Sequence, residues 1–182
     1  MAESLSEKEL ALCDEQGFLF ERSVELPLNS PSFIRRYMFS ALAESLDNGE
    51  EDVYAFSLKE LYAIVNASYP NPSVGKQGKH YPKEVLYWVG YLYRYWAFLR
   101  FRSSASLYRD YPSQLLFLSY DAYHTMDPKN AIENLEEDYL ARHPEQQEKE
   151  AIYAPIAAEL AQLGRDSEAN RLAIDYLLKK KP

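Results

Sequence analysis

The feature that most constrains this sequence is the run from Pro82 to Arg102, in which aromatic and aliphatic residues occupy about two thirds of the positions. It begins with a proline and ends before two serines, which are typical limits of a helix. Apolar residues recur on all sides of a helix drawn through this run, and a helix of that kind is normally surrounded by other helices. Because the run contains Arg94 and Arg100, a membrane span is disfavoured. We therefore predict a central core helix in a protein without a membrane segment.

Two residues of this helix indicate how it packs. Gly90 has no side chain, so it predicts the close approach of a neighbouring element. Arg94 lies among aromatic residues, where an unpaired guanidinium would be costly. It therefore requires a carboxylate, backbone carbonyls or an anionic ligand, and a structural salt bridge is the favoured choice.

Further helices are predicted on both sides of the central one, and apolar alternation never persists long enough to predict a strand. The segment 18–28 alternates poorly and is predicted to be extended or loop. Pro144 marks a linker. The predicted helices are Ser6 to about Gln16, stopped by Gly17; Ser30-Pro31 to Asn48-Gly49; Ser57 to Pro70; Ala105–Tyr111; Pro112–Tyr123; Asp127-Pro128 to about Ala141; 145–163; and 167–180.

These elements predict an all-α fold: a single helical bundle around the aromatic-rich helix, with a C-terminal helical hairpin. We divide the chain into a core domain, residues 1–143, and a hairpin, residues 144–182, that packs on the core or extends it. The hairpin turn around Gly164 is similar to the turn of a tetratricopeptide helix pair. One such unit cannot form a solenoid, so it caps the domain or supplies an interaction helix.

Composition excludes several classes of function. The chain has one cysteine, Cys13, and three histidines, so neither a disulfide framework nor a cysteine-based zinc site is expected. The two acidic residues that follow Cys13, Asp14 and Glu15, argue against a reactive thiol. The glycines and lysines of 75–79 lack the spacing of a phosphate-binding loop. We expect no metal and no cofactor. No secretory signal is visible, which predicts a cytoplasmic protein.

The net charge is −8, yet the middle of the chain is basic, with seven lysines and arginines and one acid in residues 76–109. This region could bind an anion, contact a partner or pair with the acidic N-terminal segment. Lys79, Arg94, Arg100 and Arg102 are the candidate ligands for a nucleotide or nucleic acid. Aromatic rings alternate with these basic residues and could stack on bases. Their helical spacing favours packing in the core instead, and the negative net charge of the chain disfavours binding to nucleic acid.

A catalytic reading rests on two residues. His124 precedes Asp127 by three positions, and a histidine with a nearby carboxylate can act as a general base. No nucleophile candidate lies close in sequence. A structural role at the end of a helix is therefore favoured, and we do not expect an enzyme.

The central helix also carries a resemblance. Its segment YPKEVLYWVGYLYRYW, residues 81–96, resembles a family of small bacterial proteins that share a Tyr-Trp-x-Gly-Tyr-x-Tyr-Arg-Tyr-Trp helix. The resemblance covers about residues 18–135. Its further matching pieces are residues 33–38 with Ala43 and Asp47, Gly75 with Lys79 and Tyr81, and residues 123–132. Members of that family look like antitoxins encoded beside toxin genes, including those of candidate ADP-ribosyltransferases. The resemblance supplies no catalytic residues.

The resemblance implies a protein that binds and neutralises a co-encoded toxin enzyme by steric masking. The alternative is a nucleotide- or nucleic-acid-binding protein that uses the basic middle region. An enzyme and a subunit that self-associates through the hairpin are the remaining hypotheses. The candidate binding residues are Lys79, Tyr93, Arg94, Arg100, Arg102, Tyr123, His124 and Asp127.

Overall fold

The computed structural model describes residues 5–49, 56–67 and 78–144, together with residues 147, 151, 152 and 155. The described part of the chain is helical and contains no strand, which confirms the all-α prediction. None of its helices combines the length and the hydropathy that crossing a membrane requires. The helices are α1 (Glu7–Arg22), α2 (Ser30–Met38), α3 (Ala41–Asp47), α4 (Leu58–Ala67), α5 (Lys83–Leu99), α6 (Ser104–Asp110), α7 (Ser113–Tyr123) and α8 (Pro128–Arg142), with a short 3₁₀ turn at Ser23–Glu25.

The chain divides into two compact units, Met1–Leu135 and Glu136–Pro182. The sequence predicted the boundary between the core domain and the hairpin at residues 143 and 144. In the structure the boundary between the two units falls inside α8, after Leu135. Leu135 is the last of the buried residues of α8, which accounts for the position of the division. Most of the predicted C-terminal hairpin lies outside the described residues; the few described positions there, 147, 151, 152 and 155, are helical.

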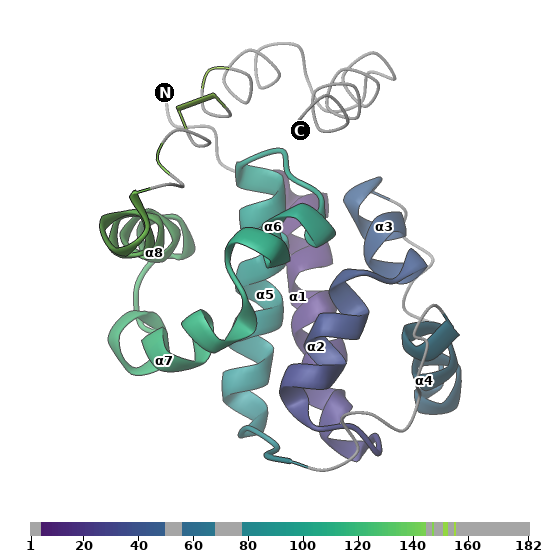
Figure 1. Ribbon diagram of the computed structural model, residues 1–182. Coiled ribbons are helices and arrows are strands. Elements are labelled where there is room, and N and C mark those ends of the chain that lie inside the picture. Colours follow the sequence, from purple (N-terminus) through teal and green to yellow (C-terminus); the bar gives the residue numbers. More distant parts are fainter. Residues whose placement is uncertain are drawn as a thin grey trace. The chain divides into compact units, whose positions relative to one another are not determined.

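Helices α1 and α5 pack along each other at the centre of the first unit, with α2, α3 and α4 to the right of this pair and α7 to the left (Figure 1). The contact is close because each helix contributes a glycine. A Cβ at Gly90 would lie 2.6 Å from the carbonyl oxygen of Gln16, and a Cβ at Gly17 would lie 2.8 Å from the ring of Tyr87. The predicted close approach at Gly90 is confirmed.

Gly17 is therefore a contact residue, and the prediction that it stops the first helix is wrong. Helix α1 continues to Arg22, so residues 18–22 are helical where the sequence predicted extended chain or loop. A glycine in a helix costs only about 1 kcal/mol relative to alanine. Packing of Gly17 against Tyr87 of α5 offsets that cost. The contact joins residues that are far apart in the sequence, so the residues around Gly17 alone do not predict it.

The single helix predicted from Ser30 to Asn48 is two helices, α2 and α3, that meet at Ser40. The hydroxyl of Ser40 accepts a hydrogen bond from the amide of Ala43 and donates one to the carbonyl oxygen of Tyr37. Ser40 thus ends one helix and begins the next. The apolar pattern continues across the break because both helices bury the same kind of face, which explains why the prediction missed it.

Helix α5 ends at Leu99, three positions before the predicted limit at Arg102. Phe101 has a φ of 51°, the left-handed conformation that usually selects glycine at this place. The amide of Arg102 donates to the carbonyl of Ala97, and that of Phe101 to the carbonyl of Phe98. This is the hydrogen-bond pattern of a Schellman cap. It turns the chain back toward α6.

The other predicted helix limits agree with the structure where it describes them. Ser57 and Glu60 form a capping box before α4, although the predicted end at Pro70 lies outside the described residues. Asp127 accepts hydrogen bonds from the amides of Lys129 and Asn130 and so caps α8. Helices α6 and α7 begin and end within a residue or so of their predicted limits.

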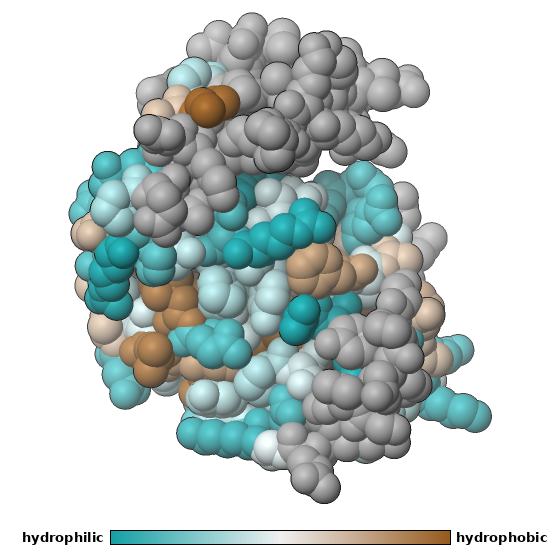
Figure 2. All heavy atoms as spheres, viewed as in Figure 1, coloured by the Kyte–Doolittle hydropathy of each residue, from teal (hydrophilic) through white to brown (hydrophobic). Residues whose placement is uncertain are grey.

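The core of the first unit is built around α5, but α5 is not covered on every side. Its buried face includes Leu86, Val89 and Trp96, whereas Tyr87, Trp88, Tyr91 and Tyr95 are only half-buried. Elsewhere, hydrophobic residues gather over α7 in the space-filling view (Figure 2), and Leu118 of that helix is 86% exposed.

Candidate functional site

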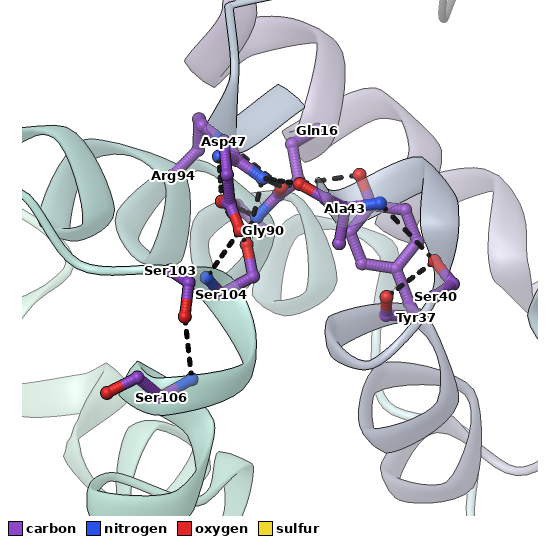
Figure 3. A network of polar contacts seen from close by, with 10 residues as sticks. All are labelled: Gln16, Tyr37, Ser40, Ala43, Asp47, Gly90, Arg94, Ser103, Ser104 and Ser106. Carbon is purple, nitrogen blue, oxygen red and sulfur yellow. Dashed lines mark hydrogen bonds and ion pairs between the residues drawn. The ribbon is translucent and has the colours of Figure 1, made fainter. Parts of the chain in front are cut away.

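Arg94 of α5 is fully buried, and protein groups surround its guanidinium (Figure 3). Its Nη1 lies 2.6 Å from Oδ1 of Asp47, at the end of α3. Its Nε and Nη2 both donate to Oε1 of Gln16, at 3.0 and 2.8 Å. Nη2 also donates to the hydroxyl of Ser104 and to the carbonyl of Ala43. The predicted structural salt bridge is confirmed.

The network extends beyond Arg94, because the residues that contact its guanidinium form further hydrogen bonds with other protein groups. The side-chain amide of Gln16 donates to the carbonyl of Gly90, and Tyr37 donates its hydroxyl to Gln16. Asp47 accepts two hydrogen bonds from Ser104, one from the amide and one from the hydroxyl. Five helices, α1, α2, α3, α5 and α6, are joined in this way. Arg94 therefore holds the fold together and offers no donor to a dissolved anion.

Arg102 and Tyr93 are also engaged inside the protein. Arg102 is buried, forms an ion pair with Asp110 and donates to Ser106. Tyr93 is fully buried, and its hydroxyl donates to the carbonyl of Tyr111 at 2.7 Å. Tyr93 thus anchors the residue that follows α6 to α5, and Arg102 ties the loop between α5 and α6 to α6.

The other two basic candidates, Lys79 and Arg100, lie near opposite ends of α5. Lys79 is exposed, and its Nζ lies 4.5 Å from the ring centroid of Tyr81, which stacks on Phe117 of α7. Arg100 is half-buried at the C-cap of α5. The glycine- and lysine-containing loop ahead of Gly78 lies outside the described residues. The four basic candidates therefore do not converge on one anion site.

His124, Asp127 and Tyr123 lie at the turn between α7 and α8. The His124 ring stacks on Tyr120, with 4.4 Å between centroids, and its Nδ1 lies 2.8 Å from the Tyr120 carbonyl oxygen. The carboxylate of Asp127 accepts a hydrogen bond from the backbone amide of Lys129 and so caps α8. His124 and Asp127 are exposed, while Tyr123, the last residue of α7, is half-buried. The described interactions include none between His124 and Asp127, so these residues act as helix-end groups. In the described part of the chain, no three His, Cys, Asp or Glu residues are placed to hold a metal ion.

A different surface stands out, and we call it the tyrosine strip: Phe18 of α1 with Tyr87, Tyr91 and Tyr95 of α5. The three tyrosines are four positions apart, so they lie on one face of α5. Their ring centroids are 6.2 Å apart from Tyr87 to Tyr91 and again from Tyr91 to Tyr95, with interplanar angles of 31° and 25°. Phe18 is 52% exposed and meets Tyr87 edge-on at 5.2 Å. The strip is a continuous row of aromatic rings.

The structure holds one end of the strip in place. Gly17 leaves room for the Tyr87 ring against the α1 backbone. One turn earlier in α1, the carboxylate of Asp14 accepts a hydrogen bond from the Tyr87 hydroxyl. The Tyr87 ring is thus held on its edge by the contact with Gly17 and at its hydroxyl by Asp14. In the described structure, the hydroxyls of Tyr91 and Tyr95 have no hydrogen-bond partner among the protein groups.

Two carboxylates act on the phenols of the strip. Burial is the main cause that raises the pKa of Tyr91 to about 12, and Cys13, Asp14 and Asp127 raise it further. Burial and Asp127 raise the pKa of Tyr95, and burial and Asp14 raise that of Tyr87. The carboxylates come from α1 and from the turn before α8. Among the described residues, neither lysine nor arginine is one of the groups that shift these three phenols.

Sequence reasoning assigned these tyrosines to the core, and none of them was a candidate binding residue. The available signal was the choice of tyrosine at three successive turns, since a phenol needs water or a partner for its hydroxyl. Cys13 beneath the strip is fully buried, and burial raises the pKa of its thiol to about 12, in agreement with the expected unreactive residue.

No protein-family model, no curated protein and no solved structure matches this chain. The likeness to antitoxin-like bacterial proteins therefore stays an expectation from the residues of the central helix and the shorter matching segments.

Proposed function

We propose that this chain is a protein-binding module that acts as an antitoxin-like neutraliser of a toxin enzyme encoded beside it. In this proposal both proteins are cytoplasmic, and the module masks the enzyme's substrate cleft sterically. The resemblance of the central helix suggests the class of partner. The observation that supports binding is the tyrosine strip, a row of partly exposed rings on two closely packed helices.

Tyrosine is enriched at protein interfaces because it offers a large apolar surface and a polar tip at low entropic cost. Tyr87 is held by Asp14 and by the space above Gly17, so little order has to be gained when a partner binds. The nucleotide alternative has less support, since Arg94 and Arg102 are buried in ion pairs with Asp47 and Asp110.

The test is co-expression of the full chain with the product of the adjacent gene, followed by affinity capture and a growth assay. We expect a stable complex and rescue of a host that expresses the enzyme. A Phe18→Ala, Tyr91→Ala double variant should weaken both. Phe39→Ala is the control because Phe39 is also a partly exposed ring, 41% exposed, at the junction of α2 and α3. Failure of the wild-type chain to form a complex or restore growth would refute the proposal.

A further inference from the structure

We infer that the tyrosine strip is the docking surface for a basic helical segment of the partner protein, with arginine or lysine side chains placed over the tyrosine rings. This inference rests on the proposed function and specifies the chemistry of the partner. Three observations support it: the spacing of the tyrosine rings, the carboxylates beside them, and the lysine that lies at one end of the strip.

The spacing of the rings fits a helix. A cation is attracted to an aromatic face when it lies within about 6 Å of the ring centroid. The centroids of Tyr87, Tyr91 and Tyr95 follow one another at intervals of 6.2 Å. Four residues of an α-helix rise about 6 Å. A partner helix that lies along α5 with a cation at every fourth residue would therefore place one cation at each ring.

The carboxylates near the strip favour a cation over an apolar or acidic partner. Asp14 contacts the Tyr87 hydroxyl, and Asp14 and Asp127 both act on the phenol of Tyr91. Glu15, next to Asp14, is half-buried. The chain as a whole carries a net charge of −8. An arginine at the strip thus meets a ring face and a carboxylate together, as at an interface with complementary charge.

The strip has a basic boundary at one end. Lys83 precedes Tyr87 by one turn of α5 and is exposed. A second cation placed there would be repelled. We therefore expect the basic part of the partner helix to lie over Tyr87 to Tyr95 and to end before Lys83.

The probe is a labelled alanine-rich helical peptide with arginine at every fourth position, titrated with the full chain and followed by fluorescence anisotropy. The matched control peptide carries glutamine in place of arginine. We expect binding of the arginine peptide alone, weakened by added salt. Tyr91→Leu should lower the affinity about two- to fivefold, which is the size of one exposed cation–π contact, whereas Tyr91→Phe should retain most of it.

The charge is tested with Asp14→Asn and Asp127→Asn together. Asparagine keeps an acceptor for the Tyr87 hydroxyl and for the α8 cap, so both variants should fold. The control pair is Glu25→Gln with Glu44→Gln, which removes the same charge from exposed positions outside α1, α5 and the α7–α8 turn. We expect the first pair to lose several-fold more affinity than the second. Equal losses, or equal binding of the glutamine peptide, would overturn the inference.

The two proposals can fail separately. A complex with the neighbouring gene product from a chain that does not bind the arginine peptide would overturn the basic-segment inference and leave the proposed function. Peptide binding with the expected variant pattern, without a complex, would support the basic docking surface and overturn the toxin enzyme as its partner.

Discussion

Asp47 and Arg94 are 47 residues apart in sequence, and their side chains meet at 2.6 Å in the interior of the first unit. The carboxylate also accepts from the backbone amide and the hydroxyl of Ser104, so one acid serves both α5 and the first turn of α6. The guanidinium has no exposed surface, while 14% of the Asp47 side chain is accessible.

Replacement of Asp47 by asparagine should destabilise the protein strongly. It leaves a buried guanidinium without its counter-charge, which costs about 3 kcal/mol or more in a buried pair. Urea unfolding of the purified variant measures this loss. Glu44→Gln on the same helix is exposed and should change the free energy of unfolding by less than about 0.5 kcal/mol. Similar stability of the two variants would contradict a structural role for the ion pair.

Substitution of Gly90 by alanine should destabilise the protein although alanine is the better helix former. The new Cβ would lie 2.6 Å from the carbonyl oxygen of Gln16 in the α1 backbone, which cannot move alone. Overpacking of this kind costs about 1–3 kcal/mol. Gly17→Ala should cost less because its nearest contact is the edge of the Tyr87 side chain at 2.8 Å, and the nearest backbone atom, the Tyr87 carbonyl oxygen, is 3.1 Å away. Thermal unfolding should rank wild type first, Gly17→Ala second and Gly90→Ala last, and any gain in stability from Gly90→Ala would refute the close packing.

The break between α2 and α3 predicts the effect of removing one hydroxyl. Ser40→Ala deletes the cap on the amide of Ala43 and the bond to the carbonyl of Tyr37, at a cost of about 1 kcal/mol. Ser45→Ala, inside α3, is the comparison and should be neutral or slightly stabilising since alanine favours helices. Chemical denaturation of both variants provides the measurement. A single continuous helix over this segment would reverse their order.

The tyrosine strip predicts a loss of stability in alkali. The folded state raises the pKa of Tyr91 from 10.0 to about 12, so the folded chain holds this proton more tightly than the unfolded chain. The resulting stabilisation is complete below pH 10 and is lost as the pH rises toward about 12. Tyr91→Phe should therefore reduce the slope of stability against pH in this window.

The slope is measured by denaturant unfolding at a series of pH values. Burial also raises the pKa of the Cys13 thiol to about 12, so wild-type Tyr91 and the phenylalanine variant are compared in a Cys13→Ala background. An identical slope for both would show that the Tyr91 phenol does not contribute.

The sequence alone predicted the helical class and most helix starts, because caps such as Ser57 and Asp127 are local signals. It also predicted that Arg94 needs an anionic partner, from the cost of a charge among aromatic rings. It could not name Asp47, since nothing local links the two positions. Gly17 was misread for the same reason: its contact with Tyr87 exists only after α1 and α5 have packed.

The tyrosine strip was missed because core and surface aromatics look alike in a sequence. Trp96 and Tyr95 are neighbours in α5, yet Trp96 is fully buried and Tyr95 is half-exposed. Periodicity gives the faces of a helix but not which face receives a neighbour. That choice depends on where α1 and α6 dock.

The network around Arg94 also has a consequence for synthesis of the chain on the ribosome. Gln16 and Asp47 leave the exit tunnel long before Arg94, which follows Gln16 by 78 residues, and the hydroxyl of Ser104 comes later still. Until Arg94 emerges, the nascent chain carries a carboxylate and an amide whose cation has not arrived, and until Ser104 follows, the network lacks its last partner. We therefore expect the emerging chain to stay open to proteases until α6 is outside the ribosome, and then to become resistant in one step. Ribosome-stalled chains of increasing length, treated briefly with protease, would locate that step.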